Sequence, residues 1–328
     1  MRHHPSRRRL LRGAGALAVL TFLTRAHAAD AWPTRPIRML VSYPAGGAND
    51  LVARLVATAL TDALGATVVV DNRSGAAGVI GAEAAAKSLP DGYTLYMMSS
   101  SQVLAPSLRK VLPYDPVRDF TAIALAARSS YVLAVHPSVP LRSMADLIAF
   151  AKANPGKLNY ASSGTGAGPH LATALFASMA GVELTHVPYR GDTPALTDLL
   201  AGQVQMAFMS MAPVIPHVKS GAIRGLAIAS ARRSNILPDL PTVAEQGLSG
   251  FDVGSWWGLV APANTPREII ERAEGVVVPF LRTPATAARF LEMGLDPGEL
   301  GASAFQLYIA SEKDKLADIV RRAGIQPE

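Results

Sequence analysis

Cysteine is absent from all 328 residues of this chain. Its absence excludes disulfide bonds, thiolate metal sites and a cysteine nucleophile. Beyond residue 28 only four histidines occur, and no two of them are spaced as i and i+4: His136, His170, His186 and His217. We therefore expect no metal site and no cofactor.

Long apolar runs are also missing. The run at 13–23 is about half of the roughly 20 apolar residues that span a bilayer. It follows a basic head and precedes Ala-His-Ala at 26–28, a small-x-small pattern. These features predict a cleavable export signal over residues 1–28, and a retained anchor is the alternative. Ser-Arg-Arg-Arg-Leu-Leu at 6–11 resembles a twin-arginine export box, for which an ordinary basic head is the alternative.

The surplus of positive charge is lost with that segment. The whole chain carries 31 Lys and Arg against 25 Asp and Glu. Residues 1–28 hold six of the basic residues and no acidic one, so 25 of each sign remain. A neutral mature protein gives no reason to expect nucleic acid or an acidic membrane as a partner. Export without disulfides suits a soluble periplasmic protein of a bacterium, and we expect a monomer.

Short strand-like runs alternate with Ala- and Leu-rich helical runs, which is typical of an α/β fold with mainly parallel sheets. Strands are expected at 37–42, 67–71, 93–98, 121–127, 131–136, 158–161, 184–188, 204–208, 225–229 and 256–260. Helices are expected from an Asn49-Asp50 cap to Gly65 and at 79–88, 144–153, 170–180, 193–201, 266–281, 285–293 and 304–323. We expect two domains around a hinged cleft, 29–128 with 254–328 and 129–253, with hinges near 128–130 and 253–255.

The turn from Tyr43 to Asp50 (Tyr-Pro-Ala-Gly-Gly-Ala-Asn-Asp) lies between a predicted strand and helix, where open α/β sheets place ligands. Its glycines let a ligand approach the backbone, and the helix start offers free N–H groups and a positive dipole end. The turn has no Gly-Lys-Ser/Thr and no dinucleotide fingerprint. We expect it to receive an anion; the alternative is a tight connection capped by Asn49 or Asp50.

A similar turn runs from Ser162 to His170 (Ser-Ser-Gly-Thr-Gly-Ala-Gly-Pro-His) in the second domain. Its hydroxyls and amides would hydrogen-bond a small polar ligand, and a solvated loop is the alternative. Two such turns on opposite domains predict a clamp. The candidate ligand-binding residues are Tyr43, Ala45, Gly46, Gly47, Asn49, Asp50, Ser99, Ser163, Gly164, Thr165, Gly166, His170, Tyr189, Arg190 and Ser210.

Two of these candidates have further interpretations. Arg190 follows a predicted strand and would pair with a carboxylate, unless it is an ordinary exposed arginine. His170 near Ser162 and Ser163 raises a secreted serine-type hydrolase as the rival function. The chain contains no Gly-x-Ser-x-Gly elbow, so we interpret His170 as a helix-start cap or ligand donor and expect no catalytic residue.

Ten segments in this order resemble the Bug or TctC family, the substrate-binding proteins of tripartite tricarboxylate transporters. The resemblance covers nearly the whole mature chain, and its segments lie at 32–38, 43–50, 70–78, 91–95, 114–116, 159–164, 170–172, 186–191, 201–204 and 237–245. They include Val-Asp-Asn-Arg-Ser-Gly-Ala-Ala-Gly at 70–78 and Leu-Pro-Asp-Leu-Pro-Thr-Val-Ala-Glu at 237–245, and ten matches in register are far more specific than any one of them.

The resemblance implies a type II periplasmic binding protein that closes on a small carboxylate. It implies that Ala45-Gly46-Gly47 and Ser163-Gly164-Thr165-Gly166 hold the ligand carboxylate, partly through ordered waters. This chain has Ala174 where the family usually has Glu, and Gln205 where it often has Asp. Our leading hypothesis is a non-catalytic receptor that delivers an organic acid to membrane transporter subunits or presents it to a sensor.

Overall fold

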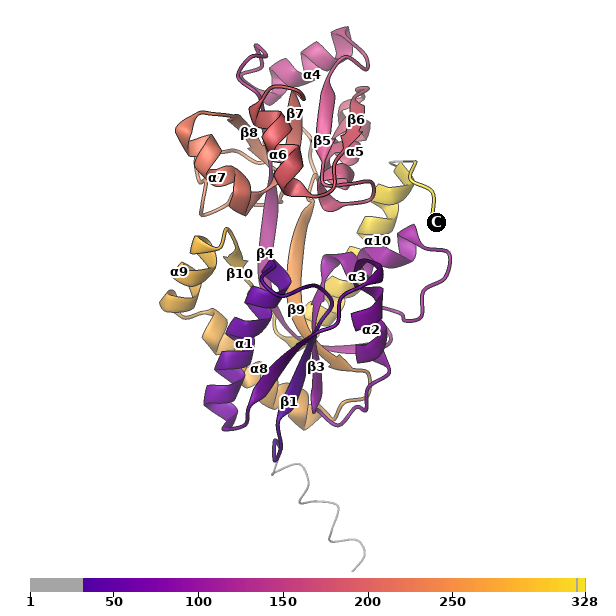
Figure 1. Ribbon diagram of the computed structural model, residues 1–328, viewed down its shortest axis with the longest axis vertical. Helices are drawn as coiled ribbons and strands as arrows, with labels where there is room; N and C mark the ends of the chain where they lie inside the picture. The colour runs from indigo at the N-terminus through magenta and orange to yellow at the C-terminus, as the bar shows by residue number, and fades with distance from the viewer. Residues whose placement is uncertain (1–31, 323, 328) are drawn as a thin grey trace, which may run out of the picture.

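The computed structural model describes residues 32–322 and 324–327. The predicted export signal lies outside these residues. Figure 1 shows two lobes stacked along the long axis, with β4 (Phe120–Val135) and β9 (Gly254–Pro262) running between them. Within the described part of the chain, no helix is both long enough and apolar enough to cross a membrane.

The first lobe is built on a sheet that contains both parallel and antiparallel strands. β1 (Ile37–Val41) pairs in parallel with β2 (Val68–Asn72) and β3 (Thr94–Ser99), and β9 runs antiparallel between β3 and β4. Buried side chains point alternately to the two faces, so that Met39 and Leu40 belong to separate hydrophobic clusters. A strand apolar on both faces needs helices on both sides.

Helices cover both faces of this sheet. One hydrophobic cluster includes residues of α1 (Ala48–Leu64) and α8 (Arg267–Leu281), and the other includes residues of α2 (Val79–Ala86), α3 (Ser100–Leu108) and α10 (Ala302–Arg322). The lobe also contains the short helix η2 (Ala76–Gly78), α9 (Pro284–Glu292) and β10 (Asp296–Pro297), which pairs with β4.

The second lobe repeats this plan with the other end of β4. β7 (Met206–Ser210) and β8 (Arg224–Ile228) pair with that end, and β5 (Asn159–Ser162) lies parallel between β7 and β6 (Thr185–Pro188). The helices of this lobe are α4 (Met144–Ala153), α5 (Gly168–Ala180), α6 (Asp192–Leu200) and α7 (Met211–Ser220). The predicted α/β fold with two lobes is confirmed.

One predicted break is wrong: the strands expected at 121–127 and 131–136 are a single strand of 16 residues, β4. The polar sequence Arg128-Ser129-Ser130 interrupted the apolar pattern. In the structure, Ser129 and Ser130 continue the ladder opposite Ser255 and Gly254 of β9. The chain therefore crosses between lobes in extended conformation.

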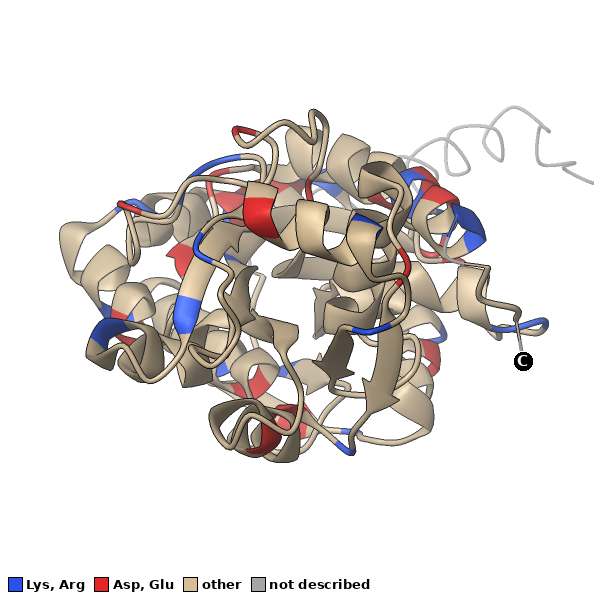
Figure 2. Cartoon of the chain, turned by 90° about the horizontal axis from the view of Figure 1, so that it is seen from above, with Lys and Arg blue, Asp and Glu red and all other residues tan. Residues whose placement is uncertain are grey.

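Two helices, α3 and α7, were not predicted. Each contains a proline, Pro106 in α3 and Pro216 in α7, which broke the helical pattern. The start of α1 also differs from the prediction: Gly47 is the N-cap, and Asn49 and Asp50 lie inside the first turn. The other predicted elements are present, with ends shifted by a few residues. Figure 2 shows acidic and basic positions interspersed in the view from above.

Candidate functional site

Asp50, at the start of α1, holds the first glycine-rich turn in place. Its carboxylate accepts hydrogen bonds from the backbone N–H of Gly46 (2.9 Å), from Asn72 Nδ2 (3.0 Å) and from Nε and Nη2 of Arg54 (both 2.9 Å). Burial alone would raise the pKa of Asp50, but these hydrogen bonds outweigh burial and hold the pKa below its ordinary value. The carboxylate stays ionised and fixes the turn, with its side chain only 2% exposed.

The backbone of the turn is exposed to solvent on the side away from the Asp50 network. Ala45, Gly46 and Gly47 are exposed, and no side chain caps the start of α1. Gly46 has φ +88°, which an L side chain rarely adopts, whereas Gly47 has an ordinary extended conformation. An uncapped helix start leaves N–H donors and a positive dipole end available to an anion.

Asn49 is buried directly behind these amides, with a relative exposure of 4%. Neither its Nδ2 nor its Oδ1 has a hydrogen-bond partner among the described residues. A buried amide without partners costs about 1–3 kcal/mol, so such a group indicates a missing partner rather than a structural tie. Asn49 is therefore the candidate in this turn whose polar atoms are free to meet a ligand or an ordered water.

Ser99 and Tyr43 belong to one network beside the first turn. Ser99 donates to Gln102 Oε1 through its backbone N–H (2.9 Å) and its hydroxyl (2.8 Å). Gln102 Nε2 then donates to the hydroxyl of Tyr43 (3.3 Å). The network ties the end of β3 and the start of α3 to the turn. Sequence reasoning missed Gln102 because α3 was not predicted.

The second turn, between β5 and α5, is also glycine-dependent and uncapped. Gly164 and Gly166 have φ values of +134° and +77°, and no side chain caps the start of α5. The backbone N–H of Gly191 donates to Ser163 O (3.2 Å), and Thr165 is exposed. The first and second turns therefore share one design, an open glycine turn before a free helix start.

Neutral aromatic rings support this second turn. His170 Nδ1 accepts a hydrogen bond from the backbone N–H of Gly166 (3.0 Å). The His170 ring stacks on His186 at 4.2 Å, and His186 stacks on Tyr160 at 4.8 Å. Burial, aided by the neighbouring His186, lowers the pKa of His170 to about 4. The ring is neutral at pH 7, as an Nδ1 acceptor must be.

His186 was not among the predicted candidates. Its Nε2 lies 2.6 Å from the hydroxyl of Ser162, which also bonds the backbone of Gly164. Burial lowers the pKa of His186 as well. His186 lies inside β6 and Ser162 is the last residue of the neighbouring parallel strand β5. Two polar residues in adjacent predicted strands were the available signal, because side chains of neighbouring strands meet across a sheet.

The remaining candidates lie at the border of the second turn. The hydroxyl of Tyr189 donates to Asp198 Oδ2 (2.5 Å), and burial together with Asp198 raises the pKa of Tyr189 to about 12. Its backbone N–H donates to Ser162 O (3.0 Å). Arg190 is exposed, with no ion pair to a described residue. Ser210 ends β7, opposite Tyr131 on β4.

The structure brings the candidates into two groups, one on each lobe. No hydrogen bond among the described residues joins the first turn to the second. The lobes approach each other where α3 ends, since a Cβ on Gly166 would stand 3.2 Å from Leu108 Cδ1. The hydroxyl of Tyr131 also bonds that of Ser255 (2.8 Å), close to Gly168 at the start of α5.

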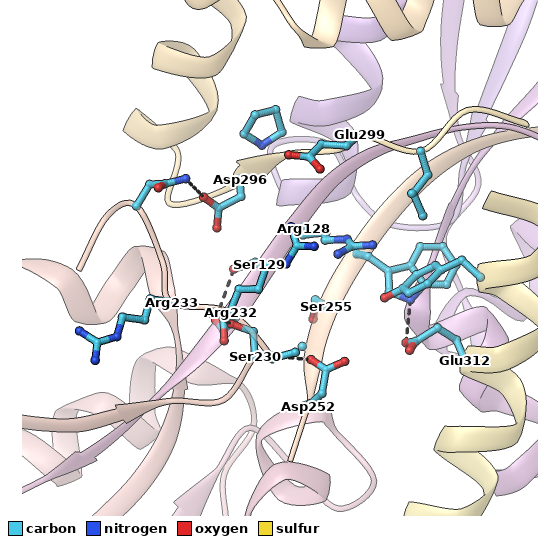
Figure 3. A pocket seen from close by; sticks show the side chains of 18 of the residues that line it. Arg128, Ser129, Ser230, Arg232, Arg233, Asp252, Ser255, Asp296, Glu299 and Glu312 are labelled. Carbon is cyan, nitrogen blue, oxygen red and sulfur yellow. Dashed lines mark hydrogen bonds between the residues drawn. The ribbon is translucent and has the colours of Figure 1, made fainter. Parts of the chain in front are cut away.

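A cavity of about 460 Å³ lies elsewhere, beside the crossing of β4 and β9 (Figure 3). None of the fifteen candidate residues lines this cavity. It is therefore separate from the two turns.

The family model described as "Tripartite tricarboxylate transporter family receptor" matches residues 52–325. The chain belongs to this family. BugT of Bordetella pertussis is 38% identical over 318 residues, covering 96% of this chain and 98% of BugT. An uncharacterised protein encoded between tcbD and tcbE in a Pseudomonas species is 41% identical over 290 residues, covering 88% of this chain and 86% of that protein.

Solved structures of family members have the same two-lobe fold. A Rhodopseudomonas palustris protein solved with adipate is 36% identical, with a TM-score of 0.76 and coverage of 90% of this chain and 100% of that one. The periplasmic binding protein BugD is 33% identical, with a TM-score of 0.73 and coverage of 90% and 100%. MatC from the same species as the adipate complex, solved with malate, is 29% identical, with a TM-score of 0.71 and coverage of 88% and 100%.

The two departures from the family pattern lie at different places. Gln205 Oε1 accepts a hydrogen bond from the backbone N–H of Asn159 (3.0 Å), so this family member still has an acceptor oxygen between β5 and β7. Ala174 lines a separate surface cavity on the side of α5 that faces Arg322. Neither residue touches the Ser163 to Gly166 turn through a hydrogen bond.

Proposed function

We propose that this TctC-family protein is a periplasmic receptor that binds a small organic carboxylate between its lobes. The observation that carries the proposal is the pair of glycine turns, each followed by an uncapped helix start, one at α1 and one at α5. The first turn is exposed and the second is half-buried apart from exposed Thr165. Such starts favour anions through free N–H groups and the helix dipole. Relatives solved with adipate and malate support a mono-, di- or tricarboxylate as the ligand class.

We propose the fifteen candidates as the ligand-binding region, with different roles. Ala45 and Gly47 on one lobe and Ser163 and Thr165 on the other would contact the ligand through amides and hydroxyls. The N–H groups of Gly46, Gly164 and Gly166 already donate within the protein, so these glycines would shape the two turns. Asp50 and His170 would act from behind, by fixing the two turns. The pKa of Asp50 is lowered, so an ionised Asp50 would repel a carboxylate if it faced the cleft directly.

The lobes would close on the ligand as two domains, 29–128 with 254–328 and 129–253. The chain crosses between them at residues 128–130 of β4 and at 253–255, where β9 begins. Residues 253–255 lie at the start of β9, whereas residues 128–130 lie inside β4, so closure would bend β4 at its crossing between the lobes. Hinges absorb such a rotation at a few residues. The ligand stabilises the closed form because it contacts both lobes at once.

The rival hydrolase would need an accessible nucleophile and a general base. Two serine–histidine pairs lie among the described residues: Ser162 with His186, in which Ser162 is fully buried, and exposed Ser138 with His136, at 2.7 Å. The histidine first considered, His170, accepts a backbone N–H of the second turn instead. None of these three histidines bonds a carboxylate among the described residues, so none is oriented as the base of a catalytic triad. We therefore favour a non-catalytic receptor that delivers its ligand to membrane transporter subunits or to a sensor.

Calorimetry on refolded, ligand-stripped protein tests the ligand class. Titration with mono-, di- and tricarboxylates should give saturable heat, without turnover of the corresponding esters. Tight binding of sugars or cations alone would contradict the proposal. The neighbouring genes would distinguish delivery to a transporter from delivery to a sensor, because membrane subunits encoded nearby would favour transport.

Export would precede this role. We propose cleavage after Ala28, which lies outside the described residues. N-terminal sequencing of the periplasmic protein should begin at Ala29. Changing Arg7 and Arg8 to Lys should block export if the twin-arginine route is used, and normal export of that variant would indicate the general secretory route.

A further inference from the structure

The carboxylate proposal does not use the cavity beside the β4–β9 crossing. Its walls come from both lobes, with Arg128, Asp296 and Tyr308 on the first and Arg232, Asn235 and Asp252 on the second. A volume of about 460 Å³ is within the range of small-molecule sites. Figure 3 shows Arg128, Asp296, Glu299 and Asp252 around this space, whereas Arg233 points away from it.

Several charges in the walls are already paired. The ammonium of Lys315 donates to Asp252 (3.1 Å) and also pairs with Glu312. Glu312 accepts a second hydrogen bond from Trp256 Nε1 (3.1 Å). Outside this group, Arg233 pairs with Glu245 (3.0 Å). These two cations and three anions satisfy one another through ion pairs, and the Trp256 N–H supports the extra carboxylate, so we look for a ligand's partners among the other charged side chains.

Four charged side chains of the wall have no ion pair within the described residues: Arg128, Arg232, Asp296 and Glu299. Arg128 and Asp296 are direct neighbours on β4 and β10, so they point to the same side of the sheet. The guanidinium of Arg128 lies 4.8 Å from the ring centre of Tyr308, which holds it in place.

Asp296 is the less well satisfied of this neighbouring pair. Its one side-chain partner is Asn235 Nδ2, at 3.4 Å. Burial raises the pKa of Asp296, and Asn235 and the charge of Arg128 offset this only in part. A cationic donor beside this carboxylate would replace solvation that the fold removes. The unpaired charges therefore amount to two cations and two anions around one space.

We propose that this cavity binds a small zwitterion with a free ammonium and a carboxylate, such as an amino acid. Its carboxylate would accept hydrogen bonds from Arg128 and Arg232, and its ammonium would donate to Asp296 and Glu299. A simple anion would face the two carboxylates, and a simple cation would face the two guanidinium groups. Only a ligand with both charges is complementary to the whole wall.

Calorimetry with alanine and three analogues tests the charge pattern. Propionate lacks the ammonium, ethylamine lacks the carboxylate, and glycine betaine lacks N–H donors. Alanine should bind, and each analogue should bind at least about tenfold more weakly, because each loses a charge-assisted hydrogen bond. Each titration is carried out on the wild type and on the Gly47→Val variant. The Val side chain shields the first turn and leaves the cavity unchanged, so binding that persists in the variant takes place away from the first turn.

Asp296→Asn and Arg128→Gln should each weaken alanine binding about tenfold. The matched controls Arg289→Gln and Glu292→Gln, on the exposed surface of α9, should leave it unchanged. Thermal unfolding checks the fold of every variant, and Glu299→Gln, at an exposed position, replaces Asp296→Asn if that variant unfolds. Loss of alanine binding in Gly47→Val with retention in Asp296→Asn would place the amino acid at the first turn and overturn the proposal. Equal binding of propionate and alanine in Gly47→Val would overturn it too.

Discussion

The two glycine turns each precede an uncapped helix start, but one is supported by a charged side chain and the other by a neutral one. The first is held by an ionised carboxylate, Asp50, which is paired with Arg54. The second is held by a neutral ring, His170, in a stack with His186 and Tyr160. In both cases the supporting group bonds a glycine N–H, at Gly46 or at Gly166. An anion-receptive turn therefore needs rigid support more than it needs support of a particular charge.

The largest expected effect comes from covering the first turn. Gly47→Val should lower carboxylate affinity by about a hundredfold or more, since the side chain blocks backbone approach and each lost charge-assisted hydrogen bond is worth about 1.5–3 kcal/mol. The fold should remain intact, because Gly47 has no left-handed φ and its Cβ would meet only Pro44 O at 3.8 Å. Calorimetry measures the carboxylate affinity, and thermal unfolding measures whether the fold is intact.

The control for this variant is Gly275→Val in α8, where a Cβ also meets open space. It should bind carboxylate like the wild type. Unchanged affinity in Gly47→Val would mean that the first turn is only structural and that the second turn alone receives the ligand.

Asp50→Asn tests whether charge is necessary in the first support. The variant should lose about 2 kcal/mol of unfolding free energy, because the amide cannot accept all four hydrogen bonds that the carboxylate accepts. Carboxylate affinity should fall with it, as Gly46 is released. Urea unfolding gives the free energy, with Asp62→Asn on the exposed side of the same helix as control. If the Asp50→Asn variant had the stability and the carboxylate affinity of the wild type, the hydrogen-bond network of Asp50 would not be what holds the turn.

The second support should respond to acid. Folding lowers the pKa of His170 from 6.5 to about 4, so the unfolded chain binds more protons between these values. Stability should therefore rise with pH from about 4 to 6.5 and fall as pH drops through that range. Protonation of the folded protein would also break the bond from Gly166 N–H, so carboxylate binding should weaken only as the pH falls toward the folded-state pKa of about 4.

His170→Asn isolates this effect, because Oδ1 offers an acceptor at the same branch of the side chain without titrating. Urea unfolding of the variant should show a smaller pH dependence between 4 and 6.5 than the wild type. Some dependence should remain, since the pKa of the buried His186 is also lowered. An unchanged pH profile would assign the dependence to groups other than His170.

The smallest effect expected is a change of shape. If one ligand joins the two turns, the lobes should close and the radius of gyration should decrease. Small-angle scattering of ligand-free and ligand-bound protein measures this. An identical radius with confirmed occupancy would indicate a preformed pocket, in which the two turns already stand at binding distance.

The sequence predicted the lobes and both turns because their signals are local. Apolar runs with regular periods mark the strands and helices, and the glycines at 46, 47, 164 and 166 mark the turns. The supports were not predictable in this way. Gln102 lies on a helix hidden by Pro106, and the stack of His170 on His186 depends on two strands meeting across a sheet. Contacts between distant segments leave no periodic pattern.

The roles of Asp50 and Asn49 show the same limit. Both were chosen as ligand contacts because they follow the glycines in the sequence. The structure directs Asp50 toward Arg54 and Asn72, whereas the side chain of Asn49 keeps its polar atoms without partners. Neighbouring positions on a helix point in directions about 100° apart, so adjacent polar residues divide between structure and ligand.

The long pairing of β4 with β9 sets the order in which the protein can be assembled. Ser129 pairs with Ser255, and the whole second lobe lies between them in the chain. The second lobe is nearly continuous, so it can acquire its sheet early. The first lobe must wait for β9, which separates β3 from β4. Until then its exposed strand edges invite pairing with other chains, because contacts between distant residues form slowly. We therefore expect the second lobe to become ordered before the first, and the first lobe to be the part that most needs protection from aggregation during folding.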